Sequence, residues 1–363
     1  MFTKKRLIIF MFSLMTLTMI LFGCSSGGDS ETEASNENGD NGGNGEQITI
    51  RFAHEEGSGD VQDLYAQKFK ELLEERTDGR ITVDIYTAGT LGSNADLFTQ
   101  LQTGAIEFAI LSPGFTGKVI PEAQVMNIPF LFSDNLEVNK KVLEESEALY
   151  GPLADQYKQK GITPFKFWLE GFMYWTANKP IQDPADMKGL KMRGMPTDMI
   201  MEAYRHLGAD PQGTDSGEIY TMLQTGGIDG QENPLFYIYS SRFHEVQDYL
   251  MESRHHIYTT LTAANTNWFE SLSTEDQELI TEIVDEVNDW SFTMQSEENE
   301  RALDAIKESD IEIVEITSEQ REKFKELAMN VKDEYLAKGG EHAQEILETI
   351  EKEIEEAEAE LKE

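Results

Sequence analysis

Arg193 is the side chain of this sequence best suited to holding an anion. It follows residues 189–192, which predict a strand, and precedes residues 194–196, a loop that leads into a predicted helix. Ligands of α/β domains bind beyond the carboxyl ends of such strands. A guanidinium offers two parallel donors to a carboxylate and keeps its charge when partly buried. Because most arginines lie at protein surfaces, the residue alone still favours an ordinary surface role.

Residues 224–234 form a second polar segment, rich in glycine, amide and acidic side chains. Taken alone, it favours a helix end followed by a tight turn. The dinucleotide-binding, phosphate-loop, serine-hydrolase and zinc-protease motifs are all missing from the sequence. His255 and His256 would point to opposite faces of a strand, a poor geometry for chelation. We therefore expect a protein that is not an enzyme, with no cofactor and no metal site.

Composition narrows the possible partners. The chain has 363 residues, 39% of them apolar, which is enough for about two domains with their own cores. Its formal net charge of −38 would repel a phosphate backbone, so nucleic-acid binding is not expected. An anionic ligand would need a local cation to overcome this field.

The amino terminus predicts export. Lys4, Lys5 and Arg6 precede an apolar run over residues 7–22, which ends at Gly23-Cys24. This pattern predicts a lipoprotein signal peptide over 1–23, cleavage before Cys24 and a lipid on its sulfur; the alternative is a general signal peptide with an incidental cysteine. Residues 24–47 predict a flexible acidic linker. We expect a protein anchored by lipid to the outer face of a cell membrane, in a Gram-positive organism.

Hydrophobic periodicity predicts an α/β chain. Alternating apolar residues indicate strands, and a period of 3.6 residues indicates helices. The expected strands are 48–53, 81–86, 108–111 and 188–193, and the expected helices are 61–73, 97–101, 197–207 and 218–224. The repeated succession of strand and helix predicts two lobes, each with a largely parallel sheet.

A long helix is expected over residues 275–309. Thr274 and Gln277 fit a capping box, and no Gly or Pro interrupts the segment. A helix of that length is roughly 50 Å long, more than one small lobe requires, so we expect it to span both. Residues 341–363 predict a terminal amphipathic helix with a solvated acidic face.

An ordered series of motifs resembles the solute-binding proteins of TRAP transporters, the DctP family. The resemblance covers the chain from about residue 48 to its carboxyl end. The segments that carry it are Gly189-Leu190-Lys191-Met192-Arg193, Leu207-Gly208-Ala209-Asp210-Pro211, residues 218–226 and Asp229-Gly230-Gln231-Glu232-Asn233-Pro234, with support from Leu91-Gly92, Pro121-Glu122-Ala123, Asn178-Lys179-Pro180-Ile181 and Phe243-x-Glu245-Val246.

The resemblance implies a two-lobe fold like that of periplasmic binding proteins, with hinge strands and a long helix across both lobes. Its expected divisions are 48–170 plus about 259–298 for lobe I, and 171–258 plus about 299–363 for lobe II. It further implies that the lobes close on a ligand, which is then delivered to a sodium-coupled TRAP membrane permease. The membrane itself would be contacted through the lipid anchor only.

The same resemblance assigns Arg193 as the partner of the ligand carboxylate and Asn233 as a residue that helps hold that end. Met173 stands where many relatives carry a second arginine, so a second ligand carboxylate loses its usual partner. Ser216 replaces a common aromatic residue. Ser112 and Phe115 occupy positions that are polar or charged in proteins that bind acidic sugars.

Other candidates for the ligand site are less decided. Glu170 is either a solvated acid or an acceptor for ligand hydroxyls. His54 and Glu55 end the first strand, which lies at the cleft in the family. Tyr237 offers an apolar wall, as do Trp168, Trp175 and Phe236, each of which individually favours a place in the core.

These residues predict the binding of a sugar acid or another hydroxylated carboxylate, with C4-dicarboxylates less favoured because of Met173. Two alternatives stay open. One is a ligand-sensing or enzymatic domain on the same lobes, and the other is a structural lipoprotein that binds no ligand.

Overall fold

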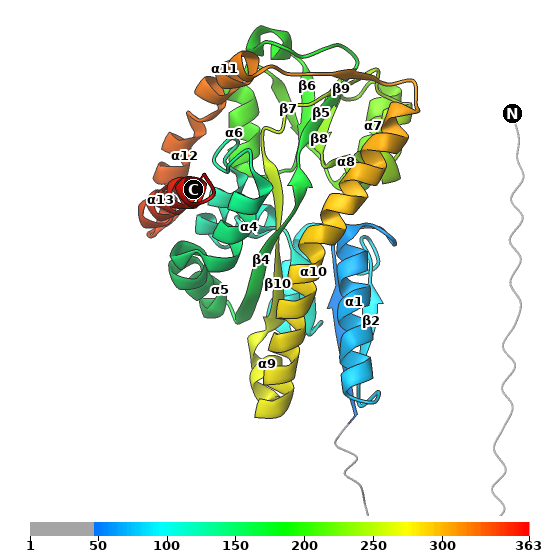
Figure 1. Ribbon diagram of the computed structural model, residues 1–363, viewed down its shortest axis with the longest axis vertical. Helices are drawn as coiled ribbons and strands as arrows, with labels where there is room; N and C mark the ends of the chain where they lie inside the picture. Colours follow the sequence, from blue (N-terminus) through cyan, green and yellow to red (C-terminus); the bar gives the residue numbers. More distant parts are fainter. Residues whose placement is uncertain (1–46, 363) are drawn as a thin grey trace, which may run out of the picture. The chain divides into compact units, whose positions relative to one another are not determined.

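The computed structural model describes residues 47–362. The expected signal peptide, Cys24 and all but the last residue of the expected linker lie outside this range. The described residues contain two sheets, one in the lower half of the view in Figure 1 and one in the upper half. None of the helices among them is both long and apolar enough to cross a membrane.

The first sheet has five strands in the order β2-β1-β3-β10-β4. Their bounds are β1 Ile48–Ala53, β2 Ile81–Tyr86, β3 Phe108–Leu111, β4 Ile162–Phe172 and β10 Ile257–Asn265. The helical segments near it are α1 Val61–Arg76, α2 Asn94–Thr103, α3 Pro113–Thr116, η1 Pro121–Asn127, α4 Leu136–Glu145, η2 Leu149–Leu153, α5 Ala154–Gln159 and α9 Thr266–Ser271. Phe52, Phe69 and Phe108 pack edge-on or stacked in the centre of this core.

The second sheet has six strands in the order β11-β9-β5-β8-β6-β7. Their bounds are β5 Tyr174–Ala177, β6 Lys191–Gly194, β7 Asp210–Gly213, β8 Gly230–Asn233, β9 Tyr249–Met251 and β11 Glu312–Val314. The helical segments in this part of the chain are η3 Pro184–Met187, α6 Asp198–His206, η4 Ser216–Glu218, α7 Ile219–Thr225, α8 Leu235–Ser240, η5 Phe243–Glu245, α11 Ser318–Ala328 and α12 Val331–Lys338.

Parallel pairing is confined to part of each sheet. β1 pairs in parallel with β2 and β3, β6 pairs in parallel with β7 and β8, and β9 pairs in parallel with β11. The expectation of largely parallel sheets is wrong for the strands that pass between the sheets, because β4, β5 and β10 make antiparallel pairs. The chain leaves the first sheet along β4 and returns along β10, so these strands run in opposite directions.

Two chain crossings join the sheets at Met173 and at residues 252–256. The amide of Met173 donates to the carbonyl of His256 at 2.7 Å, which ties one crossing to the other. Gly171 lies beside this point with φ of +122°, and a Cβ there would lie 2.7 Å from Nδ2 of Asn299. His255 and His256 lie in the connecting segment rather than on a strand, contrary to the placement considered from sequence.

The helix α10, Thr274–Lys307, is the third connection between the sheets. It begins at Ser273, whose hydroxyl accepts from the amide of Asp276, and runs for 34 residues. It packs on α1 and β4 and, further along, on α8, as Figure 1 shows. The expected long helix spanning both lobes is confirmed.

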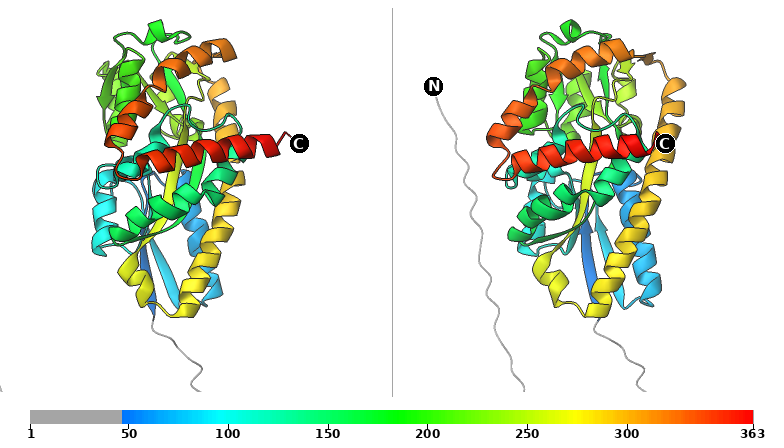
Figure 2. Two further views of the ribbon diagram at one scale, coloured as in Figure 1. Left: turned by 90° about the vertical axis from the view of Figure 1, so that its left-hand side faces the viewer. Right: turned by 60° about the vertical axis from the view of Figure 1, so that its left-hand side comes forward.

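The terminal helix α13, Ala343–Glu360, packs against α4 and η1. Figure 2 shows it in red, lying across the elements that connect the upper and lower sheets. Its buried residues, which include Ile346, Leu347 and Ile350, form one face, as the amphipathic pattern predicts. The residues of α13 were expected in the second lobe, but the helix contacts elements of the first lobe. The lobe boundaries inferred from the family stay a prediction.

Candidate functional site

A narrow cavity of about 20 Å³ lies between the two sheets. Glu55, Glu56, Asn94 and Phe115 reach it from the first lobe. The remaining lining residues come from the second lobe and from β10: Arg193, Met195, Ser216, Asn233, Pro234, Tyr237 and Tyr258.

Arg193 is buried in the wall formed by the second sheet, with 2% of its surface exposed. Nε and Nη2 both donate to the carbonyl oxygen of Thr214, at 3.0 and 2.8 Å, and this two-point grip fixes the plane of the guanidinium. Burial lowers the pKa of Arg193, and the negative charge of Glu232 opposes that effect. Within residues 47–362 no carboxylate forms an ion pair with Arg193. The wall therefore presents a buried cation whose anion is not supplied by the described residues.

Asn233 lies beside Arg193 because β8 neighbours β6 in the sheet, where Arg193 is in register with Gln231. Residues at i and i+2 of a strand share a face, so Gln231 and Asn233 project from the same side. The Asn233 amide nitrogen donates to the Gln231 side chain. The two polar residues assigned to the carboxylate end thus meet in one cavity.

The opposite wall is acidic. Glu55 is buried, and its Oε1 accepts from the amide of Ser112 at 3.1 Å, whereas Oε2 is buried without a hydrogen-bond partner among the described residues. Burial raises the pKa of Glu55 to about 8. A carboxyl with this environment is ready either to keep a proton or to receive a cation.

Glu56 and Glu170 are buried carboxyls that influence the pKa of each other. Gln62 contacts both carboxyls. Its backbone amide donates to Oε2 of Glu56 at 2.9 Å, and its side-chain Nε2 donates to Oε1 of Glu170 at 2.8 Å. Burial raises the pKa of Glu56, and it raises the pKa of Glu170 to about 7. Both carboxyls therefore favour their protonated forms more than a solvated carboxyl does.

The structure brings six of the ten candidate residues to the cavity: Glu55, Phe115, Arg193, Ser216, Asn233 and Tyr237. Ser112 stands just behind the wall and supplies the amide that holds Glu55. Glu170 is not a solvated acid, because it is fully buried. It lies in contact with Glu56 rather than on the lining.

His54 and Met173 do not line the cavity. His54 is fully buried, where Nε2 approaches Oδ1 of Asp63 at 3.3 Å, so it holds the start of α1 rather than a ligand. Met173 is fully buried at the chain crossing. Trp168 and Trp175 belong to the cores, the first stacked on Tyr65 and the second on His255.

Sequence reasoning missed Glu56, Asn94, Met195, Pro234 and Tyr258. Glu56 could have been found, since it directly follows Glu55 beyond the same strand. Tyr258 gave no signal, because it lies far along the chain on β10 and reaches the cavity only through the return crossing.

A shallower depression adjoins the cavity and shares Asn94, Ser216 and Tyr237 with it. Its other lining residues include Asp60 of the first lobe and Ser240 of the second. The depression is therefore lined from both lobes and shares part of its wall with the cavity that contains Arg193.

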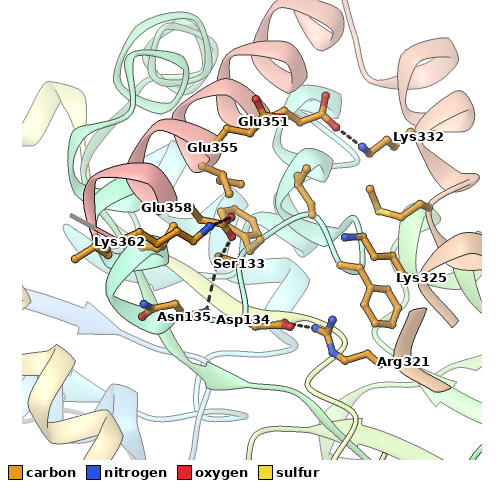
Figure 3. A pocket seen from close by; sticks show the side chains of 17 residues that line it. Ser133, Asp134, Asn135, Arg321, Lys325, Lys332, Glu351, Glu355, Glu358 and Lys362 are labelled. Atoms are coloured by element: carbon orange, nitrogen blue, oxygen red, sulfur yellow. Dashed lines mark hydrogen bonds and ion pairs between the residues drawn. The ribbon is translucent and has the colours of Figure 1, made fainter. Parts of the chain in front are cut away.

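A wider groove lies elsewhere, between α13, α11 and the loop after η1 (Figure 3). Several of its side chains interact with one another. Arg321 forms an ion pair with Asp134, Lys332 forms one with Glu351, and the hydroxyl of Ser133 donates to Glu358 at 2.6 Å. Four basic and four acidic side chains line the groove, so its charge is balanced overall, although Lys325 has no ion pair among the described residues.

Comparison with known proteins identifies the family and the fold. Residues 52–338 match the family model DctP, described as bacterial extracellular solute-binding protein, family 7. The chain is 38% identical over 299 residues to the ectoine-binding periplasmic protein TeaA of Halomonas elongata, covering 82% of this chain and 87% of that protein. It is 36% identical to the ectoine/5-hydroxyectoine-binding protein UehA of Ruegeria pomeroyi, covering 82% and 88%.

Solved structures share the fold. The TeaA structure from the TeaABC TRAP transporter superposes with a TM-score of 0.81 at 36% identity, covering 85% of this chain and 99% of that one. The sugar acid binding protein DctPAm of Advenella mimigardefordensis, solved with galactonate, superposes with a TM-score of 0.79 at 29% identity, covering 86% and 99%. The chain belongs to the DctP family of extracytoplasmic solute-binding proteins of TRAP transporters.

Proposed function

We propose that this protein captures a small zwitterion that carries one carboxylate and one cationic nitrogen, of which ectoine is the leading candidate, and delivers it to a TRAP permease. The observation that carries the proposal is the opposition of charges within one narrow cavity. Among residues 47–362, a buried arginine without a paired anion forms one wall, and buried carboxyls without a paired cation form the other.

Arg193 is the proposed carboxylate anchor. Removing a charge from water is costly unless a partner compensates it, so a buried guanidinium held only by one carbonyl gains most from an arriving anion. Two of its donors are already used to fix its plane, which reduces the entropy lost on binding. Asn233 supplies an amide next to the same ligand group.

Glu55 and Glu56 are the proposed partners of the cationic nitrogen. A cation between them would satisfy the free Oε2 of Glu55 and replace a proton held by Glu56 or Glu170. The aromatic side chains of Phe115, Tyr237 and Tyr258 line the remaining space and suit a small ring. This charge pattern favours a zwitterion over a dicarboxylate, whose second carboxylate would face the acidic wall.

A hydroxylated sugar acid is the second candidate. Carboxyls that hold protons near neutral pH can both donate to and accept from ligand hydroxyls, and the pKa values of Glu55 and Glu170 are raised into that range by burial. In this case Arg193 would hold the acid group in the same way, and the acidic wall would bind neutral oxygen atoms instead of a cation.

A titration of the purified protein with ectoine, galactonate and succinate tests the choice. We expect ectoine to bind most tightly and to raise the thermal midpoint, since a ligand at a hundredfold excess over its Kd adds about 2.7 kcal/mol. If galactonate binds most tightly, the ligand is a sugar acid and the zwitterion proposal is wrong. The absence of binding by any of the three would refute it. Recovery of the unchanged ligand by mass spectrometry separates capture from an enzymatic role.

Lipid attachment at Cys24 and delivery to a sodium-coupled permease complete the proposal. Both rest on the sequence pattern of the amino terminus and on the family. A Cys24→Ser variant expressed in a Gram-positive host should appear in the culture medium, whereas the wild type should stay with the membrane fraction. Equal partition of the two proteins would contradict the anchor.

A further inference from the structure

A line of buried side-chain hydrogen bonds runs from the cavity through the second lobe. Asn233 donates to Gln231, and Nε2 of Gln231 donates to Oγ1 of Thr176 at 3.0 Å. That hydroxyl donates to Oε1 of Gln247 at 3.0 Å, and Nε2 of Gln247 donates to Oδ1 of Asn178 at 2.8 Å. Only the first member of this line, Asn233, lines the cavity.

Gln247, at the end of the line away from the cavity, determines which atom donates in every hydrogen bond of the line. Nε2 of Gln247 also donates to the carbonyl of Val246 at 3.2 Å, and a carbonyl can only accept. The nitrogen of Gln247 must therefore face Val246, which leaves Oε1 to face Thr176. The single hydroxyl proton of Thr176 goes to that oxygen, so Thr176 can only accept from the nitrogen of Gln231.

The same reasoning continues to the ligand. Because the Gln231 nitrogen faces Thr176, its oxygen faces Asn233 and must receive an amide proton from it. The side-chain amide of Asn233 is thereby held in one orientation. Its oxygen and its second amide proton remain available to the cavity. Without this line, its amide could turn by half a revolution and exchange donor for acceptor at the ligand.

We propose that Gln231, Thr176 and Gln247 are positioning residues that hold the Asn233 amide in the single orientation in which it meets the ligand carboxylate. This inference rests on the proposed function. Thr176 and Gln231 are fully buried and Gln247 nearly so, although apolar side chains would fill a core without needing partners. Preorganising a polar group before the ligand arrives reduces the entropy lost on binding.

A double-mutant cycle with ectoine as the probe tests the proposal. Thr176→Val preserves shape and removes the hydroxyl, so we expect ectoine affinity to fall about tenfold. In an Asn233→Ala background the same substitution should cost less than about twofold, because the residue through which it acts is gone. An equal loss in both backgrounds, or no loss in either, would overturn the positioning role.

Matched variants separate positioning from damage to the fold. Thr176→Ser retains the hydroxyl and should restore affinity to within about twofold of wild type. Thr262→Val removes another fully buried threonine hydroxyl, one that accepts from Trp168 in the first sheet, and should leave ectoine affinity unchanged. If Thr176→Val does not fold, Gln247→Met interrupts the same line and is put through the same cycle.

A measurement without ligand decides the inference even if ectoine is not the ligand. In nitrogen-15 spectra of the full chain, the side-chain amide of Asn233 should shift in Thr176→Val, and its protons should exchange about tenfold faster or more with water. An unchanged signal would refute the line of hydrogen bonds. A changed signal in a protein that does not bind ectoine would support it and refute the proposed ligand instead.

Discussion

The two walls of the cavity are built on different principles. The wall of the second lobe carries a permanent charge on Arg193, which is held by Thr214, and a neighbouring amide whose bonds are determined by buried partners. The wall of the first lobe carries carboxyls whose charge depends on pH, and two of their oxygens lack partners among residues 47–362. Under the proposed function, one wall is therefore prepared before the ligand arrives, whereas the other acquires its final charge state only with the ligand.

The largest effect should come from removing the permanent charge. Arg193→Ala should weaken the binding of any carboxylate ligand about a thousandfold while the fold persists, because truncating one partner of a buried charge pair costs 2–5 kcal/mol or more, about 30-fold to several thousandfold in affinity. Isothermal titration measures the loss. Arg205→Ala is the matched control, since Arg205 lies on α6 of the same lobe and is exposed in an ion pair with Glu202. Wild-type affinity in Arg193→Ala would contradict the role of Arg193 as the carboxylate anchor.

The next effect should come from the acidic wall. Glu55→Gln retains an acceptor for the Ser112 amide but removes the charge, so ectoine affinity should fall roughly ten- to a hundredfold, as a charge-assisted hydrogen bond is lost. Galactonate, which has no cation, should lose less. Glu71→Gln, an exposed change on α1, provides the control. Equal losses of affinity for ectoine and galactonate would show that this wall does not bind the cationic group of the ligand.

The contrast between the walls also predicts a pH dependence of binding. Burial raises the pKa of Glu55 to about 8 and that of Glu170 to about 7, and a cation binds their ionised forms. Ectoine affinity should therefore rise between about pH 6 and pH 8, by up to tenfold per unit for each proton released. Titrations in buffers of different ionisation enthalpy measure that release. Constant affinity across this range would contradict the charge state assigned to the acidic wall.

The ligand-free protein should show the opposite trend in stability. Above about pH 5 both carboxyls are ionised in the unfolded chain, whereas the folded protein holds its protons up to the raised pKa values. The free energy of unfolding should then fall as pH rises from about 5 to 8. The titratable and charged groups near these carboxyls are Glu56, Asp60, Asp63, His54, Tyr237, Tyr258 and Arg193. A Glu55→Gln variant should flatten the slope measured by denaturant unfolding, and an unaltered slope would argue against Glu55 as its source.

The smallest effect concerns the crossing that joins the two walls. Gly171→Ala places a Cβ at positive φ and against Asn299, so it should lower the free energy of unfolding by about 1–3 kcal/mol. Gly217→Ala is the control, because Gly217 has open space around it and no positive φ. Thermal unfolding compares the two. Equal stability of both variants would mean that the crossing adapts to a side chain.

Much of the architecture follows from local patterns. The strands at 48–53 and 81–86 form where alternation predicts them, and α10 covers the segment in which no Gly or Pro occurs. Arg193 and Asn233 also lie where the family motifs place them, because strand ends determine position along a sheet edge. The parallel character of the sheets was overestimated, since pairing direction depends on which strands cross between lobes.

The sequence by itself determined the elements, the family and the single cation of the binding wall, because periodicity, strand ends and motif order are local properties of the chain. Only the tertiary structure decided that Glu56 and Tyr258 line the cavity, that His54 and Met173 do not, and that Glu170 is buried against another carboxyl. These facts depend on contacts between residues far apart in the chain, which set burial and therefore charge. The direction of the hydrogen bonds behind Asn233 has the same origin, since Thr176, Gln231 and Gln247 meet only in the folded sheet.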